Sequence, residues 1–194
     1  MRGGRRHSRR SALLDLYACF LIPAYTLLFA GSVEWFGTNF SVRAVLGENY
    51  YWGFVVWGLL AGSYFFVMLT RLTFLLRGVW TRLGLLVLIL AACLSLAYAI
   101  AIPYLPQQIP RWADLHVLLA SGACVLVMAV LLVLILRLGR ERNKPVGPLL
   151  AAWLVIVLVS GVLFALAGMV SSALEIFFAI SAALLIRALW LRSH

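Results

Sequence analysis

Six long apolar segments constrain this chain more than any other feature of its sequence. A helix needs roughly 20 apolar residues to cross the hydrocarbon core of a bilayer, which is about 30 Å thick. The sequence predicts an all-α polytopic membrane protein, a six-helix bundle over residues 12–191 that follows a basic segment at 1–11. The predicted spans are Ala12–Val33, Tyr50–Thr70, Leu83–Leu105, Trp112–Leu136, Pro148–Met169 and Ser171–Leu191.

Basic residues predict the orientation of these spans. All but two of the 16 Lys and Arg residues lie before the first span, in the second and fourth loops, or at the C-terminal end; the exceptions are Arg43 and Arg111. Because cytoplasmic loops carry an excess of positive charge, both termini are expected in the cytoplasm. A signal peptide is not expected, since the first apolar run is too long and no A-x-A cleavage site follows it.

The net charge of +10 does not indicate a nucleic-acid partner. A pI near 10.4 is typical of such proteins, but here the basic residues gather at span ends rather than along one stripe. The hydrophobic fraction is 65%, well above soluble usage. The three cysteines, Cys19, Cys93 and Cys124, lie inside spans without metal or CxxC spacing, so we interpret them as packing residues.

Small residues form stripes on several predicted spans, where they would allow close helix packing. We expect these stripes to face the bundle interior. GxxxG spacing indicates packing rather than function, and it leaves a homo-oligomer or another membrane-protein partner open. The stripes are Gly58 and Gly62; Ala92, Ser95 and Ala99; Gly161, Ala165 and Gly168; and Ser172, Glu175, Ala179 and Ala182.

Two ionisable residues inside spans are the main candidates for a functional site, because such groups are costly in a bilayer. His116 and Glu175 each lie about one turn into a helix, at similar depth below the outer surface and on a small-residue stripe. We predict that they approach within hydrogen-bond or one-water distance. Further candidates to complete this cluster are Glu34, Asp114, Ser171 and Ser172.

Several chemistries fit a His–Glu cluster. It is compatible with a structural hydrogen-bonded pair, with a ligand or cationic headgroup site beside aromatic residues, or with activation of water or a serine for hydrolysis. A metal held with Asp114 or Glu34 also fits the residue types. No H-x-x-x-H, H-E-x-x-H or G-x-S-x-G motif is present, and a lone His within the spans excludes bis-His haem ligation. We expect no metal and no cofactor.

The first span and the segment after it carry three further signals. Pro23 is expected to kink the first helix. Asp15, slightly inside that helix, is interpreted as structural, with Arg187 or an N-terminal Arg as its partner. The stretch Gly37–Asn49 is too short to span and too apolar for a free loop, so we expect it over the pocket mouth or along the interface, as a short helix.

Three pieces of the chain carry a resemblance: FGTNFSV at 36–42, IPYLPQQIPRWADLH at 102–116 and VSSALEIFF at 170–178. With the six-span plan they resemble small six-helix bacterial membrane proteins, and more distantly the DRAM/FRAG/SFK-like family. The resemblance implies six helices with both ends cytoplasmic in a bacterial cell membrane, and a lipid-related role at the non-cytoplasmic leaflet. The matched candidate residues are Asn39, Ser41, His116 and Glu175.

Together these features favour a protein that binds or handles a lipid or amphiphile at an outer-facing polar pocket, with membrane lipids as partners. An enzymatic version is a lipid hydrolase or transferase. Two alternatives stay open, a substrate-binding subunit of a small-molecule transporter and a non-catalytic sensor or assembly partner.

Overall fold

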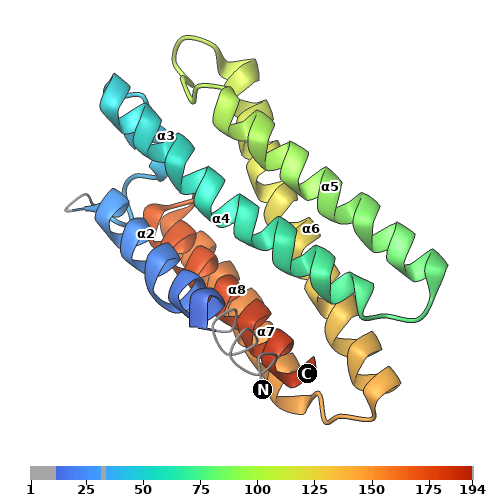
Figure 1. The fold of residues 1–194 in the computed structure, drawn as a ribbon. Helices are drawn as coiled ribbons and strands as arrows, with labels where there is room; N and C mark the ends of the chain where they lie inside the picture. Colours follow the sequence, from blue (N-terminus) through green and yellow to red (C-terminus); the bar gives the residue numbers. More distant parts are fainter. Residues whose placement is uncertain (1–11, 32–33, 194) are drawn as a thin grey trace.

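The computed structural model describes residues 12–31 and 34–193, and within them it contains six helices long and apolar enough to cross a membrane (Figure 1). The all-α, six-span prediction is confirmed; the basic segment at 1–11 lies outside the described residues. The first span, Ala12–Ala30, includes the π-helical turn η1 (Tyr17–Leu21) and α2 (Ile22–Ala30). The other elements are α3 (Phe40–Ala44), α4 (Glu48–Phe74), α5 (Val79–Ala101), α6 (Pro110–Arg142), α7 (Gly147–Ala167) and α8 (Ser172–Ser193).

Two helix ends differ most from the predicted ones. α5 stops at Ala101 because Ile102 is extended, with φ −88° and ψ 116°, as expected for a residue before proline. α6 continues past Leu136 to Arg142 and has 33 residues, so it is about 50 Å long. That length exceeds the apolar thickness of a bilayer, and the basic last turns of α6 therefore extend beyond it.

The π-helical turn η1 ends two residues before Pro23. Proline lacks an N–H, and its ring clashes with the carbonyl four residues earlier, here that of Cys19. A π-turn at Tyr17–Leu21 shifts the hydrogen-bond register at this position. The expected disturbance of the first helix by Pro23 thus takes the form of a local widening.

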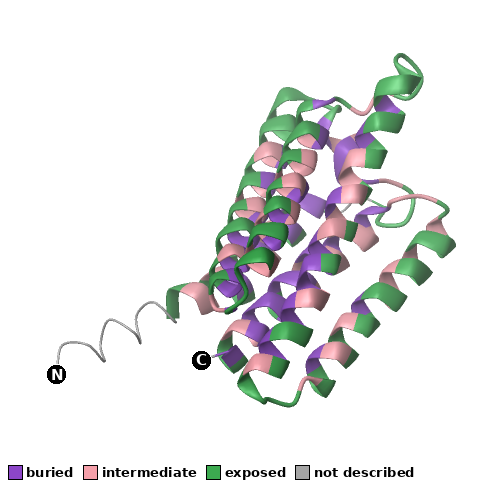
Figure 2. Ribbon diagram, turned by 90° about the vertical axis from the view of Figure 1, so that its right-hand side faces the viewer, coloured by how far each residue is buried: buried purple, intermediate pink, exposed green. Residues whose placement is uncertain are grey.

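The helices form two groups joined through α4 and α8. α5 packs between α4 and α6, while α8 contacts α2, α4 and α7. In Figure 2 the buried residues follow the helix faces that point at neighbours, and the outer faces are exposed. α7 is the most peripheral span, since 11% of its most apolar stretch is buried against 44% for α8. α3 lies at one end of the bundle, which we call the α3 end; the opposite end, where the first span begins and α8 finishes, is the terminal end.

Small-residue packing is confirmed on α4. Gly58 is buried, and a Cβ added there would collide with the Ile100 side chain of α5, so glycine permits this close approach. The α8 stripe also faces inward, because Ala179 and Ala182 are buried.

The α7 stripe does not face inward, and this prediction was wrong. Gly161, Ala165 and Gly168 are exposed, and nothing lies within 4 Å of a Cβ added at Gly161. α7 is apolar on every side, so its sequence periodicity does not identify the packing face. The buried residues of α7 are Leu149 and Ile156.

Candidate functional site

The short helix α3 is held to the bundle by its first residue. Asn39 caps the helix, and its side-chain oxygen accepts a hydrogen bond of 2.8 Å from the Val42 N–H. Phe40 is fully buried, with its ring edge-on to Phe29 at 5.1 Å and to Trp57 at 5.0 Å between centroids. The predicted short helix within Gly37–Asn49 is confirmed as α3, and its position over a pocket mouth or along the interface stays a prediction.

His116 on α6 is buried and uses both ring nitrogens. Its Nε2 lies 2.7 Å from Ser41 Oγ on α3, and its Nδ1 lies 3.0 Å from the carbonyl oxygen of Ile102. A carbonyl only accepts, so in the neutral imidazole the proton sits on Nδ1 and Nε2 accepts from the Ser41 hydroxyl. The ring of Tyr104 lies against the imidazole at 5.5 Å between centroids.

Glu175 on α8 is half-buried and binds the residue before Ser41. Its Oε2 accepts a hydrogen bond of 2.7 Å from the Phe40 N–H. His116 and Glu175 therefore hold two successive residues of α3. We name Ser41, His116 and Glu175 the α3-end cluster.

Of the predicted approach of His116 and Glu175 within hydrogen-bond or one-water distance, the direct hydrogen bond is not present, and the one-water distance stays a prediction. Both imidazole nitrogens are bonded to other groups, and no hydrogen bond or ion pair joins the two side chains within the described part of the chain. Matched depth brought both residues to the same end of the bundle. Each of them bonds α3 instead of the other, Glu175 at Phe40 and His116 at Ser41.

The first backbone N–H groups of α8 form hydrogen bonds with the segment before α3. Ser172 donates its backbone N–H to the Thr38 carbonyl at 2.7 Å, and Ala173 donates to the Trp35 carbonyl at 2.9 Å. Ser171 is buried, and its hydroxyl accepts from the Leu174 N–H at 3.4 Å. Since the first N–H groups of α8 have partners, this helix start holds residues 35–38 in place. Ser172 is fully buried, and its hydroxyl has no hydrogen-bond partner within residues 12–31 and 34–193.

Two predicted cluster members lie elsewhere. Glu34 and Asp114 are exposed, and neither carboxylate bonds a member of the α3-end cluster within the residues that the structure describes. Asp114 is two residues from His116, and a helix turns by about 200° over that interval, so it points away from the buried face. Asn39 caps α3 rather than facing an open site.

Sequence reasoning missed two contributors to this end of the bundle. Arg43 donates to the Ala30 carbonyl, and its guanidinium lies 5.6 Å and 5.0 Å from the ring centroids of Phe29 and Tyr50. The Ile102 carbonyl is the other. Pro103 was the available signal, because it ends α5 and lets this carbonyl turn to His116.

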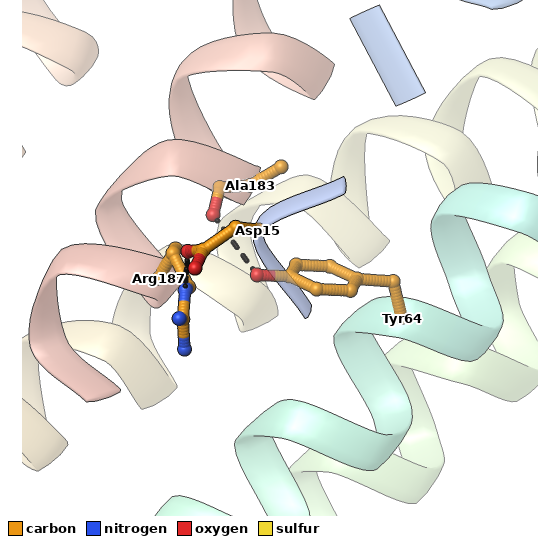
Figure 3. Close-up of polar contacts among 4 residues, drawn as sticks. All are labelled: Asp15, Tyr64, Ala183 and Arg187. Atoms are coloured by element: carbon orange, nitrogen blue, oxygen red, sulfur yellow. Dashed lines mark hydrogen bonds and ion pairs between the residues drawn. The ribbon is translucent and has the colours of Figure 1, made fainter. Parts of the chain in front are cut away.

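A second buried polar site lies near the terminal end. Arg187 on α8 is 3% exposed, and its Nε donates to Asp15 Oδ1 at 2.6 Å; Asp15 is 49% exposed. The Tyr64 hydroxyl donates to the Ala183 carbonyl at 3.3 Å, one turn from Arg187 (Figure 3). The prediction that Arg187 is a partner of Asp15 is confirmed, and we name these two residues the terminal-end pair.

A side groove of about 390 Å³ runs between α7 and α8 near the α3 end. Its one polar residue, Ser181, donates its hydroxyl to the Phe177 carbonyl at 2.6 Å, so the groove presents an apolar wall. Glu175 lies next to one groove residue, Ile176. The lining residues are Trp35, Leu163, Ala173, Ile176, Phe177, Ile180 and Ser181.

Comparison of this chain with known protein families, with curated proteins and with solved structures found no match. The class of protein therefore follows from its own architecture. Six long apolar helices make it a multi-pass integral membrane protein.

Proposed function

We propose that this protein binds a lipid or similar amphiphile at the α3 end. The observation that carries the proposal is the side groove between α7 and α8. It reaches from Ala173 to Ser181, eight residues along α8, or roughly 12 Å. This length accommodates part of an acyl chain, and Glu175 lies in sequence between two residues that line the groove, Ala173 and Ile176.

Affinity in such a site comes from the polar head of the ligand. Lipid tails are as apolar as the groove, so burying a chain there gains little over leaving it in the bilayer. Glu175 offers a polar contact, because only its Oε2 is bonded and its Oε1 has no hydrogen-bond partner within the described residues. A hydroxyl or ammonium headgroup fits this oxygen. The predicted orientation places the α3 end at the outer leaflet.

Photo-crosslinking tests the proposal. The protein is placed in nanodiscs of phosphatidylethanolamine and phosphatidylglycerol that contain a phospholipid with a diazirine in its acyl chain. We expect crosslinks to concentrate on groove residues of α7 and α8. Ala173→Trp should fill the groove and reduce them about tenfold, a change of about 1.4 kcal/mol in binding free energy.

The matched control is Ala165→Trp, which places the same side chain on the exposed face of α7. It should leave the crosslinking pattern in the groove unchanged. Equal crosslinking over all lipid-facing surfaces, or an equal response to both substitutions, would refute the lipid site.

A second candidate function is that of a non-catalytic assembly partner. The supporting observation is the outward-facing stripe Gly161, Ala165 and Gly168, because small residues allow close approach of another membrane helix. A Cys at position 161 should then form disulfide-linked or copper-catalysed dimers in native membranes. A Cys at position 166, on an exposed but bulky part of α7, is the control.

A further inference from the structure

The contact between Ser41 and His116 has the arrangement of a nucleophile with its general base. The hydroxyl and Nε2 are 2.7 Å apart, inside the range for proton transfer. The Nδ1 contact with the Ile102 carbonyl at 3.0 Å leaves the Nε2 lone pair directed at the serine. In the general form of such sites, a third group orients the base in this way.

The surroundings favour this chemistry over a solvated hydrogen bond. Ser41 is 6% exposed and His116 is 4% exposed, so water competes little for either group. Tyr104 packs on the imidazole and restricts the ring from turning away from Ser41. The other hydroxyl near His116 along α6, that of Ser121, donates to the Val117 carbonyl of its own helix and has no basic partner among the residues that the structure describes.

We propose that Ser41 and His116 carry out acyl transfer from a lipid ester, an inference that rests on the proposed function and names its substrate class. Two features connect the dyad with a lipid. Ser41 follows Phe40, whose N–H is bonded by Glu175, and Glu175 directly precedes Ile176, a residue that lines the side groove. The depth also fits, since Ser41 lies at the end of the spans, where the ester carbonyls of a lipid meet the polar region of the bilayer.

The reaction is balanced without a metal or redox partner. The Ser41 hydroxyl attacks the ester carbonyl carbon as its proton moves to His116 Nε2. The ester C–O bond then breaks, and His116 returns the proton to the departing alkoxide. The products are an acyl-Ser41 ester and a lysolipid alcohol. Water or a second alcohol, deprotonated by the same Nε2, attacks the acyl-Ser41 carbonyl and regenerates the serine.

Glu175 is a positioning residue in this scheme. It holds the backbone of Phe40 and so fixes the adjacent Ser41 against His116. Ser41 and His116 are both covered in this structure, so a substrate carbonyl reaches them only if side chains around α3 move. Val42 and Arg43, which follow Ser41, are only half-buried and form the accessible edge of α3.

A fluorophosphonate probe tests the dyad directly, because it phosphonylates activated serines. The full-length protein in detergent micelles is treated with the probe, digested and analysed by mass spectrometry. We expect one adduct, on Ser41. Ser41→Ala should remove it, and His116→Ala should slow its formation about 100-fold, the usual contribution of a general base. Ser121→Ala is the matched control and should label like the parent protein.

A second variant addresses the acyl intermediate. Ser41→Cys, incubated in the phospholipid nanodiscs used for crosslinking, should accumulate a thioester at position 41 that hydroxylamine removes. Failure of the folded parent protein to label at Ser41 would overturn the dyad, even with lipid crosslinks intact. Labelling at Ser41 without lipid crosslinks in the groove would overturn the lipid substrate and the proposed function while the dyad stands.

Discussion

The α3-end cluster and the terminal-end pair differ in the segments that supply their residues. The terminal-end pair, Asp15 and Arg187, joins the first span to the last. In the α3-end cluster, Glu175 and His116 come from spans, but their partners Phe40 and Ser41 lie on a five-residue helix between spans. A site between spans moves only if the bundle repacks. A site completed by a short helix can open while the spans stay in place, and this is the property expected of a place where a ligand enters.

The largest effect expected from this difference is at Phe40. Phe40→Ala removes a fully buried ring, a change that costs about 3–5 kcal/mol in a packed core. Because α3 lies between spans, we expect the loss to release α3 rather than unfold the bundle. Hydrogen exchange should speed up in residues 36–47 and remain slow in α4, α5 and α6.

The control is Phe36→Ala, since Phe36 is exposed and its removal should change little. If Phe40→Ala lowered the thermal stability of all spans equally, α3 would be part of the same cooperative unit. The contrast between the two sites would then fail.

Asp15→Ala should act on the whole bundle. Removing one partner of a buried ion pair costs several kcal/mol, and the half-exposed position of Asp15 reduces the expected loss to about 2 kcal/mol. The midpoint of thermal unfolding should fall, with no selective change in exchange at α3. Asp114→Ala, at an exposed carboxylate, should leave the midpoint unchanged. Equal midpoints for the two variants would show that the terminal-end pair does not stabilise the fold.

A pair of substitutions at Glu175 separates its hydrogen bond from its charge. Glu175→Ala leaves the Phe40 N–H without its acceptor, at a cost of about 1–3 kcal/mol. Glu175→Gln keeps an oxygen for that N–H and should preserve the protection of α3 against exchange. If Glu175 also binds a headgroup, Glu175→Gln should lose lipid crosslinking at normal expression. Intact crosslinking with Gln would assign Glu175 a structural role alone.

The smallest effect concerns the cap of α3. Asn39→Ala removes the acceptor for the Val42 N–H and should destabilise α3 by about 1 kcal/mol. Exchange in residues 40–44 should rise modestly, and the terminal-end pair should be unaffected. Asn49→Ala is the control, because Asn49 is exposed. No difference between the two variants would show that packing of Phe40 alone determines the position of α3.

Apolar run length was sufficient to predict the six spans, and the cost of ionisable groups in lipid identified His116 and Glu175. The position of Asp15 just inside the first span pointed to a basic partner, with Arg187 as one of two candidates. The partners at the α3 end were harder to predict. Equal depth gives a position along the bundle axis, but it does not fix the separation across the bundle. His116 therefore bonds Ile102 and Ser41 rather than Glu175.

Two of the bonds that build the cluster involve backbone groups, the Phe40 N–H and the Ile102 carbonyl, which every residue type carries. Pro103 was the one sequence signal for either group, because a proline after Ile102 ends α5 and frees the Ile102 carbonyl. The sequence also could not predict that the small-residue stripe of α7 faces outward. Gly161 lies in a helix that is apolar on every side, so no polar face distinguishes the outer surface from the packed one.

The bonds from α8 to residues 35–40 have a consequence for biosynthesis. Thr38 and Phe40 emerge from the ribosome more than 130 residues before their partners Ser172 and Glu175. Asp15 likewise precedes Arg187 by 172 residues. A nascent chain that has inserted the helices before α8 thus lacks the partners of residues 35–40 at one end of the bundle and of Asp15 at the other. Insertion of α8 supplies both sets of partners. Translation products that stop short of residue 172 leave the Phe40 N–H and the Asp15 carboxylate without these partners, so neither segment is held by α8.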